Sequence, residues 1–224
     1  MLYRSIYREG LLEDQVIVVS GGGSGIGRCI AHEVAALGAQ AVLIGRREEN
    51  LEKVAKEIAE DGGKVGFFAC DIREETRVKE TVAEIVAKYG RIDGLVNNAG
   101  GQFPAPLDKI SANGWQAVLN TNLMGGFLFA RECYTQSMKG RGGAIVNIIA
   151  DMWGGMPGMG HRGAALDGGP HRVAVVLHDK DAGEGEEPRE VHRLVQRALV
   201  ERPVAEEGER DFLLCGRAVA HARV

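Results

Sequence analysis

The sequence has little of what several classes of protein require. Its 224 residues include only four cysteines, and their spacing matches no metal-binding pattern. No apolar run approaches the roughly 18 residues of a transmembrane helix, and no signal-peptide pattern opens the chain. The formal net charge is only −4, which provides no attraction to nucleic acid or to anionic membranes. We therefore expect no metal site, no nucleic-acid partner and no membrane segment.

The composition is typical of a single globular α/β protein. Hydrophobic residues make up 45% of the 224 positions, enough to form one α/β core. The cysteines are expected to be small buried hydrophobic residues in a reducing compartment. The residues His221 to Val224 differ from the Ser-Lys-Leu address of peroxisomes. We therefore expect a cytoplasmic location.

Strand-like and helix-like segments alternate through the first two thirds of the chain. Short apolar runs predict strands at 16–20, 41–44, 64–69, 95–97 and 144–149. Apolar residues at helical spacing predict helices at 26–37, 48–60, 74–89 and 115–138. Buried strands separated by helices indicate a parallel sheet with helices on both faces. The expected fold class is α/β, a Rossmann-like doubly wound parallel sheet.

A glycine-rich turn directly follows the first expected strand. The residues from Ser20 to Gly27 read Ser-Gly-Gly-Gly-Ser-Gly-Ile-Gly. Gly21 permits a tight turn, Gly25 lets the backbone approach a pyrophosphate, and Gly27 lets the next helix pack closely. The free N–H groups at the start of that helix hold anionic phosphates. An ordinary glycine-rich turn is the alternative. The residues of this segment expected to bind a dinucleotide are Ser20, Gly21, Ser24, Gly25, Ile26 and Gly27.

The end of the second expected strand predicts which dinucleotide binds. A carboxylate there would bind the hydroxyls of the adenosine ribose and favour NAD. This chain has Gly45, Arg46 and Arg47 instead. A small residue leaves room for a 2′-phosphate, and guanidinium groups pair with it. We therefore expect NADP, with Arg46 and Arg47 as its ligands, although both arginines could instead be solvated charges.

The turn has the spacing Gly-x-x-x-Gly-x-Gly, and Val96-Asn97-Asn98-Ala99-Gly100 follows about 75 residues later. This pairing resembles the short-chain dehydrogenase/reductase family, from about Leu11 to Ala165. Shorter sequence motifs, such as Gly-Gly-Gln-Phe ending at Phe103, are similar to those of the peroxisomal trans-2-enoyl-CoA reductases and their bacterial relatives. The resemblance implies an NADP-dependent oxidoreductase that acts on a small molecule of the acyl-CoA class and forms a homo-oligomer.

The resemblance also assigns roles to individual residues. Asp71 matches the adenine-binding aspartate of the family, although it could instead cap the helix that follows. Asn98, Ala99 and Gly100 belong to the motif that ties the central strand to the cofactor ribose. Asn122 matches the asparagine that supports a proton-relay water in the family's catalytic centre.

The rest of that catalytic centre is missing from the sequence. The serine position of the family falls on Ala150, which has no hydroxyl group. No tyrosine follows Tyr134, so the Tyr-x-x-x-Lys motif is absent. His161 is a candidate proton donor, because an unperturbed imidazole titrates near neutral pH. The alternative is a loop histidine without a catalytic role.

Nothing after residue 165 is recognised. We expect a dinucleotide-binding Rossmann domain at 1–165 and a C-terminal segment at 166–224 that packs on or trails the same domain, with a strand near 172–178 and a helix near 189–200. One hypothesis is a truncated or frame-shifted gene product. The sequence thus predicts an NADPH-dependent reductase of enoyl-CoA or a related carbonyl substrate. The alternative is a catalytically impaired cofactor-binding or oligomer-partner protein.

Overall fold

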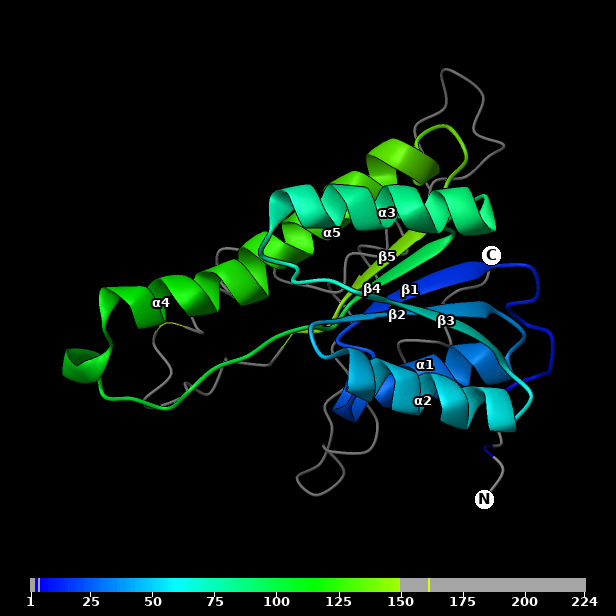
Figure 1. Ribbon diagram of the computed structural model, residues 1–224, viewed down its shortest axis with the longest axis horizontal. Coiled ribbons are helices and arrows are strands. Elements are labelled where there is room, and N and C mark those ends of the chain that lie inside the picture. Colours follow the sequence, from blue (N-terminus) through cyan, green and yellow to red (C-terminus); the bar gives the residue numbers. More distant parts are fainter. Residues whose placement is uncertain (1–2, 4, 150–160, 162–224) are drawn as a thin grey trace, which may run out of the picture. The chain divides into compact units, whose positions relative to one another are not determined.

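The computed structural model describes Tyr3, residues 5–149 and His161. These residues form five strands and the helices between them (Figure 1). The strands are β1 (Val16–Ser20), β2 (Gln40–Gly45), β3 (Lys64–Ala69), β4 (Gly94–Asn97) and β5 (Ala144–Asn147). The α-helices are α1 (Gly25–Ala36), α2 (Glu48–Glu60), α3 (Glu75–Tyr89), α4 (Ala112–Leu119) and α5 (Gly125–Cys133).

All five strands are parallel, and they lie in the order β3-β2-β1-β4-β5. The chain moves outward from β1 to β3 and then returns to the other side of β1 with β4. Figure 1 shows α1 and α2 on one face of the sheet and α3 and α5 on the other. This is the expected doubly wound α/β fold, and the strand order reverses between β1 and β4. A crevice forms at such a reversal, at the carboxyl ends of the strands.

Hydrophobic side chains are buried on both faces of the sheet, and one large cluster lies on the α3–α5 face. Val18 of β1, Val42 of β2, Ile85 of α3 and Phe129 of α5 are each 0% exposed and belong to one hydrophobic cluster. The central strand β1 is buried along its whole length, which explains its uninterrupted apolar sequence. This packing fixes the carboxyl ends of β1, β2 and β4 relative to one another.

One predicted helix differs from the structure. The helix expected at 115–138 begins three residues earlier, because the Ser111 hydroxyl accepts a hydrogen bond from the Gly114 backbone N–H (3.0 Å) and caps it. It is also interrupted by two π-helical segments, Asn120–Met124 and Tyr134–Met138. Apolar periodicity does not distinguish a π-turn from an α-turn. A short 3-10 helix at Leu107–Lys109 was not predicted.

The predicted domain boundary at 165 and the elements expected at 172–178 and 189–200 lie outside the described residues. Within the described part of the chain, no helix is long and apolar enough to cross a membrane. The same residues contain no cluster of His, Cys, Asp or Glu suited to a metal ion. Cys70 and Cys133 are buried as expected, but Cys29 is exposed because it lies on the outer side of α1.

Candidate functional site

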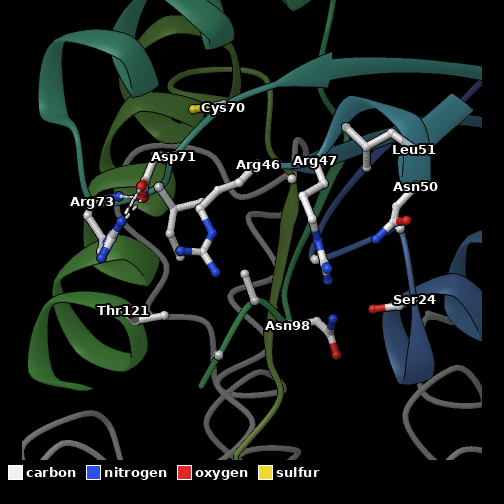
Figure 2. Close-up of a pocket in the computed structure, with 16 residues that line it drawn as sticks. Ser24, Arg46, Arg47, Asn50, Leu51, Cys70, Asp71, Arg73, Asn98 and Thr121 are labelled. Atoms are coloured by element: carbon white, nitrogen blue, oxygen red, sulfur yellow. Dashed lines mark hydrogen bonds and ion pairs between the residues drawn. The ribbon is translucent and has the colours of Figure 1, made fainter. Parts of the chain in front are cut away.

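A pocket of about 240 Å³ lies at the carboxyl ends of β1, β2 and β4 and at the loop after β3 (Figure 2). Its walls come from the glycine turn after β1, the segments that follow β2 and β3, and the loop after β4. The lining residues are Gly21, Gly23, Ser24, Gly45, Arg46, Arg47, Asn50, Leu51, Cys70, Asp71, Ile72, Arg73, Asn98, Ala99, Gly100 and Thr121. Most of the sequence-predicted cofactor residues therefore meet in one cavity.

Three glycines of the turn have different surroundings. Gly21 has a positive φ of 69°, and an added Cβ there would lie 2.8 Å from the Asn98 amide nitrogen. An added Cβ at Gly27 would lie only 2.2 Å from the Gly21 carbonyl oxygen. Gly25 also has a positive φ, 54°, but a Cβ there would meet no protein atom within 4 Å. Gly21 and Gly27 thus permit close packing of the turn, whereas Gly25 borders open space that a ligand can enter.

Ser20 holds the turn against the exit of β4. Its buried hydroxyl oxygen accepts hydrogen bonds from the backbone N–H groups of Asn98 and Ala99, both at 3.0 Å. The Asn98 side chain donates in return to the Ser20 carbonyl oxygen at 3.0 Å. Ser20 does not line the pocket. It positions two of the pocket's walls and does not face a ligand.

The two predicted phosphate ligands extend into the pocket. Figure 2 shows the side chains of Arg46 and Arg47 entering it from the segment between β2 and α2. Neither guanidinium group forms a hydrogen bond or ion pair with any residue that the structure describes. The arginines at 28, 73, 77, 91 and 131 each bind a carboxylate. The pocket therefore presents two unpaired cationic groups.

The N-termini of α1 and α2 both lie at the pocket, and they differ in charge. The N-cap residue of α1 is Ser24, whose side chain makes no capping hydrogen bond, and the first turn of α1 contains no acidic residue. The N-cap residue of α2 is Arg47, again without a side-chain cap, but the first turn of α2 carries Glu48 and Glu49. The first N–H groups of α1 are therefore left for another partner, and an anion is the partner that such a helix N-terminus favours.

Asp71 is the only carboxylate among the lining residues, and Arg73 holds it. The Arg73 Nε donates to both Asp71 oxygens, at 2.9 and 3.1 Å, and Nη2 donates to Oδ2. The Arg73 guanidinium keeps the pKa of the Asp71 carboxyl below its usual value. Helix α3 is capped at Glu74, and the Asp71 side chain makes no bond to it. The alternative that Asp71 is a helix cap is therefore wrong.

Asn122 lies in the first π-helical segment, beside the pocket residue Thr121. Its side-chain amide donates to the carbonyl oxygens of Gly101 (2.7 Å) and Val118 (2.8 Å). Its side-chain oxygen accepts from the Gly101 N–H at 3.2 Å. π-turns are frequent at functional sites. Here the segment ties the loop after β4 to the long helix.

His161 lies outside the pocket. It is fully buried and its backbone is helical, so it is not a loop residue. Its ring packs against Phe103, with the ring centroids 4.6 Å apart. Neither ring nitrogen has a hydrogen-bond partner among the residues that are described. Asn122 and His161 therefore contact the same loop, at Gly101 and Phe103. The predicted serine position, Ala150, falls outside the described residues.

The pocket differs in two ways from the cofactor site predicted from the sequence. Gly25, Ile26 and Gly27 were predicted to bind the cofactor but do not line the pocket, although Gly25 faces open space. Asn50 and Arg73 were missed. The signals for them were present, since Asn50 lies in the first turn of the helix after Arg47 and Arg73 follows Asp71 by two residues. Both are polar residues next to positions that were singled out.

Comparison with known proteins places this architecture among enzymes. A family model described as short chain dehydrogenase matches residues 15–161. A probable 2,4-dienoyl-CoA reductase of Bacillus subtilis is 36% identical over 162 residues, which cover 70% of this chain and 63% of that protein. A peroxisomal 2,4-dienoyl-CoA reductase of Danio rerio is 36% identical over 73% of this chain and 53% of its own length. The chain thus spans a little over half of the length of these curated relatives.

Solved structures agree with this assignment. A citronellol catabolism dehydrogenase of Pseudomonas aeruginosa is 63% identical and superposes with a TM-score of 0.71, covering 74% of this chain and 68% of that one. A short chain dehydrogenase of Mycobacterium smegmatis is 30% identical, with a TM-score of 0.69 and coverages of 75% and 72%. The family match spans more than half of the chain and agrees with the sheet order and the glycine turn. The chain therefore belongs to the short-chain dehydrogenase family of oxidoreductases.

Proposed function

We propose that this chain is an NADPH-dependent oxidoreductase that reduces the double bond of an enoyl-CoA or a related carbonyl substrate. The observation that carries the proposal is that Arg46 and Arg47, in a pocket formed by the glycine turn, have no hydrogen-bond or ion-pair partner among the described residues. No carboxylate stands at the end of β2, where NAD-binding proteins place one to bind the ribose. The free positive charge matches the 2′-phosphate that distinguishes NADP from NAD.

The residues present fit a dinucleotide. The open space at Gly25 and the uncapped start of α1 suit the pyrophosphate. The start of α2, with Arg46, Arg47 and Asn50, suits the 2′-phosphate. In this proposal adenine binds beside Asp71, after β3, and the nicotinamide ribose binds at the loop after β4. When bound, the nicotinamide supplies a hydride, and this chain binds, orients and shields the reacting groups.

The substrate class rests on the relatives. The two curated relatives above are named for the reduction of dienoyl-CoA, an unsaturated acyl thioester. The related structure is named for citronellol catabolism. Both names involve lipid-like chains that carry unsaturation. An unsaturated acyl-CoA of this kind, or a related carbonyl compound, is the substrate class we propose.

A second candidate function is a cofactor-binding protein with impaired turnover. Ala150 stands where the family pattern has serine, and the Tyr-x-x-x-Lys motif is absent. The Asn122 amide is already bound to Gly101 and Val118. Without a general acid the rate falls by about 10²–10⁴-fold. His161 is the remaining candidate donor, with both ring nitrogens unpartnered among the described residues.

The proposal includes a cytoplasmic location and a homo-oligomeric state. Met124, Phe127 and Tyr134 are exposed at helical spacing along α5 and its flanking turns, with exposed fractions of 47%, 54% and 42%. An apolar stripe of this kind suits a second copy of the chain. In this reading, a chain without turnover would still serve as an oligomer partner of intact relatives. Sedimentation of the purified protein and of a Phe127→Glu variant tests the oligomer.

The cofactor proposal is tested by titrating the protein with NADPH and with NADH. We expect tighter binding of NADPH, and an Arg46→Ala/Arg47→Ala double variant should lose most of this preference. The expected loss is about five- to 150-fold, as for a coupling of about 1–3 kcal/mol. Arg8→Ala is a matched control, because Arg8 is exposed and does not line the pocket. Equal affinity for both cofactors in the unmodified protein contradicts the proposal.

Turnover separates the two candidate functions. NADPH oxidation is measured with a trans-2-enoyl-CoA, beside the binding titration. A turnover number near 10 s⁻¹, which is typical of enzymes, supports the reductase, and His161→Ala should then abolish it. Binding of NADPH with a turnover at least about 100-fold lower supports the impaired protein.

A further inference from the structure

The Asp71–Arg73 pair occupies one end of the pocket, next to Arg46. Figure 2 shows Arg46 between this pair and Arg47. Both oxygens of the Asp71 carboxylate accept hydrogen bonds from Arg73, from its Nε, its Nη2 and its backbone N–H. The two side chains are 18% and 37% exposed, so water screens the pair only in part. Arg73 therefore engages the carboxylate with three N–H groups.

Arg46 lies beside this pair and lines the same pocket (Figure 2). The Arg73 guanidinium is the main cause of the lowered pKa of the Asp71 carboxyl, and the charge of Arg46 adds a smaller contribution in the same direction. Asp71 thus lies near two cations and forms hydrogen bonds with Arg73. Arg46 has no hydrogen-bond or ion-pair partner among the residues that the structure describes.

We propose that Arg73 is a positioning residue for cofactor choice: by binding Asp71 it keeps the only carboxylate of the pocket from capturing Arg46, which stays available for a 2′-phosphate. The inference rests on the proposed NADP site. It predicts a defined consequence of losing Arg73. Asp71 would then attract Arg46, and its charge would also repel the incoming phosphate.

The experiment measures the affinity of two cofactor fragments, 2′,5′-ADP and 5′-AMP, by calorimetry. Their ratio isolates the contribution of the 2′-phosphate and requires no turnover. We expect Arg73→Gln to lower the preference for 2′,5′-ADP over 5′-AMP by roughly three- to tenfold. In Asp71→Asn/Arg73→Gln the competing charge is gone, so the preference should return to within about twofold of the Asp71→Asn variant.

Arg91→Gln is the matched control. Arg91 binds Asp93 two residues away, and its exposed fraction of 39% is close to that of Arg73, but it lies outside the pocket. This variant should leave the preference unchanged. Circular dichroism and thermal melts verify that each variant is folded.

The outcomes distinguish this inference from the proposed function. No preference for 2′,5′-ADP in the unmodified protein contradicts both. A preference that survives in Arg73→Gln overturns the inference alone. Equal losses of both ligands in Arg73→Gln also overturn it, since Arg73 would then only shape the adenine side. If Arg73→Gln lowers the preference for 2′,5′-ADP and the double variant Asp71→Asn/Arg73→Gln does not restore it, Asp71 does not compete for Arg46, and the mechanism proposed here is overturned.

Discussion

Replacing Gly27 by alanine tests how closely the start of α1 packs against the glycine turn at Gly21. The added methyl group would lie 2.2 Å from the Gly21 carbonyl oxygen and 2.5 Å from the Asn98 amide nitrogen. An ordinary contact needs more than 3 Å, so the start of α1 must move away from the turn by about 1 Å. The nearest atom belongs to the backbone, which cannot turn aside as a side chain would. The strain should therefore appear as lost stability.

We expect a loss of about 1–3 kcal/mol, the usual cost of overpacking. For a protein of about 150–250 residues, this corresponds to a drop in Tm of about 2–12 °C. Scanning calorimetry or a thermal melt followed by circular dichroism measures it. The matched variant is Gly25→Ala, whose methyl group would meet no protein atom within 4 Å.

Gly25→Ala should affect both folding and binding, for reasons other than a clash with the protein. Its positive φ of 54° makes alanine unfavourable there, by about 1–2 kcal/mol. Its methyl group would also fill the space proposed for the pyrophosphate, so NADPH affinity should fall at least about tenfold. A Gly27→Ala protein that melts within about 1 °C of the unmodified protein refutes the close approach of α1 to the turn.

Three further results are expected. Ser20→Ala removes the acceptor of two partly buried backbone N–H groups, those of Asn98 and Ala99, and should lower the free energy of unfolding by about 1–3 kcal/mol in a urea titration; Ser20→Thr, which keeps the hydroxyl, should not. Iodoacetamide should modify Cys29 before Cys133, because Cys29 is exposed and burial raises the pKa of the Cys133 thiol; equal rates in a mass-spectrometric time course would contradict this packing. Arg73 lowers the pKa of Asp71, so the stabilisation by this pair is present above the unfolded-state pKa of about 3.9 and is lost as the pH falls through the lower folded value; Asp71→Asn should therefore reduce stability at pH 7, and a deficit that does not shrink as the pH falls below about 3.9 would count against the ion pair.

The sequence predicted the described fold closely where the apolar pattern is strong. The bounds of β1, α2 and β3 agree with the expected segments at both ends. The cause is physical, because β1 is a short apolar run that ends at a glycine, α2 has an apolar stripe between Arg47 and Asp61, and β3 begins after Gly63. The long helix before β5 was less predictable, since two π-turns interrupt it without changing its apolar spacing.

The pocket was predictable in part. Gly21 and Arg46 directly follow β1 and β2, and Asp71 is the second residue after β3. Parallel strands bring such residues to one edge of the sheet. The position of Arg73, two residues after Asp71, marks it as a neighbour of the pocket, but only the structure shows that it binds both oxygens of Asp71. The chemistry around His161 was not predictable either, since its contact with Phe103 joins residues 58 positions apart.

The central claim is that a dinucleotide binds in the pocket described here. Hydrogen exchange followed by mass spectrometry, with and without NADPH, tests it most directly. The account predicts slower exchange of backbone amides at residues 21–27, 45–51, 70–73 and 98–100, and no change along β5. Protection confined to other segments, or no protection at saturating NADPH, would contradict it.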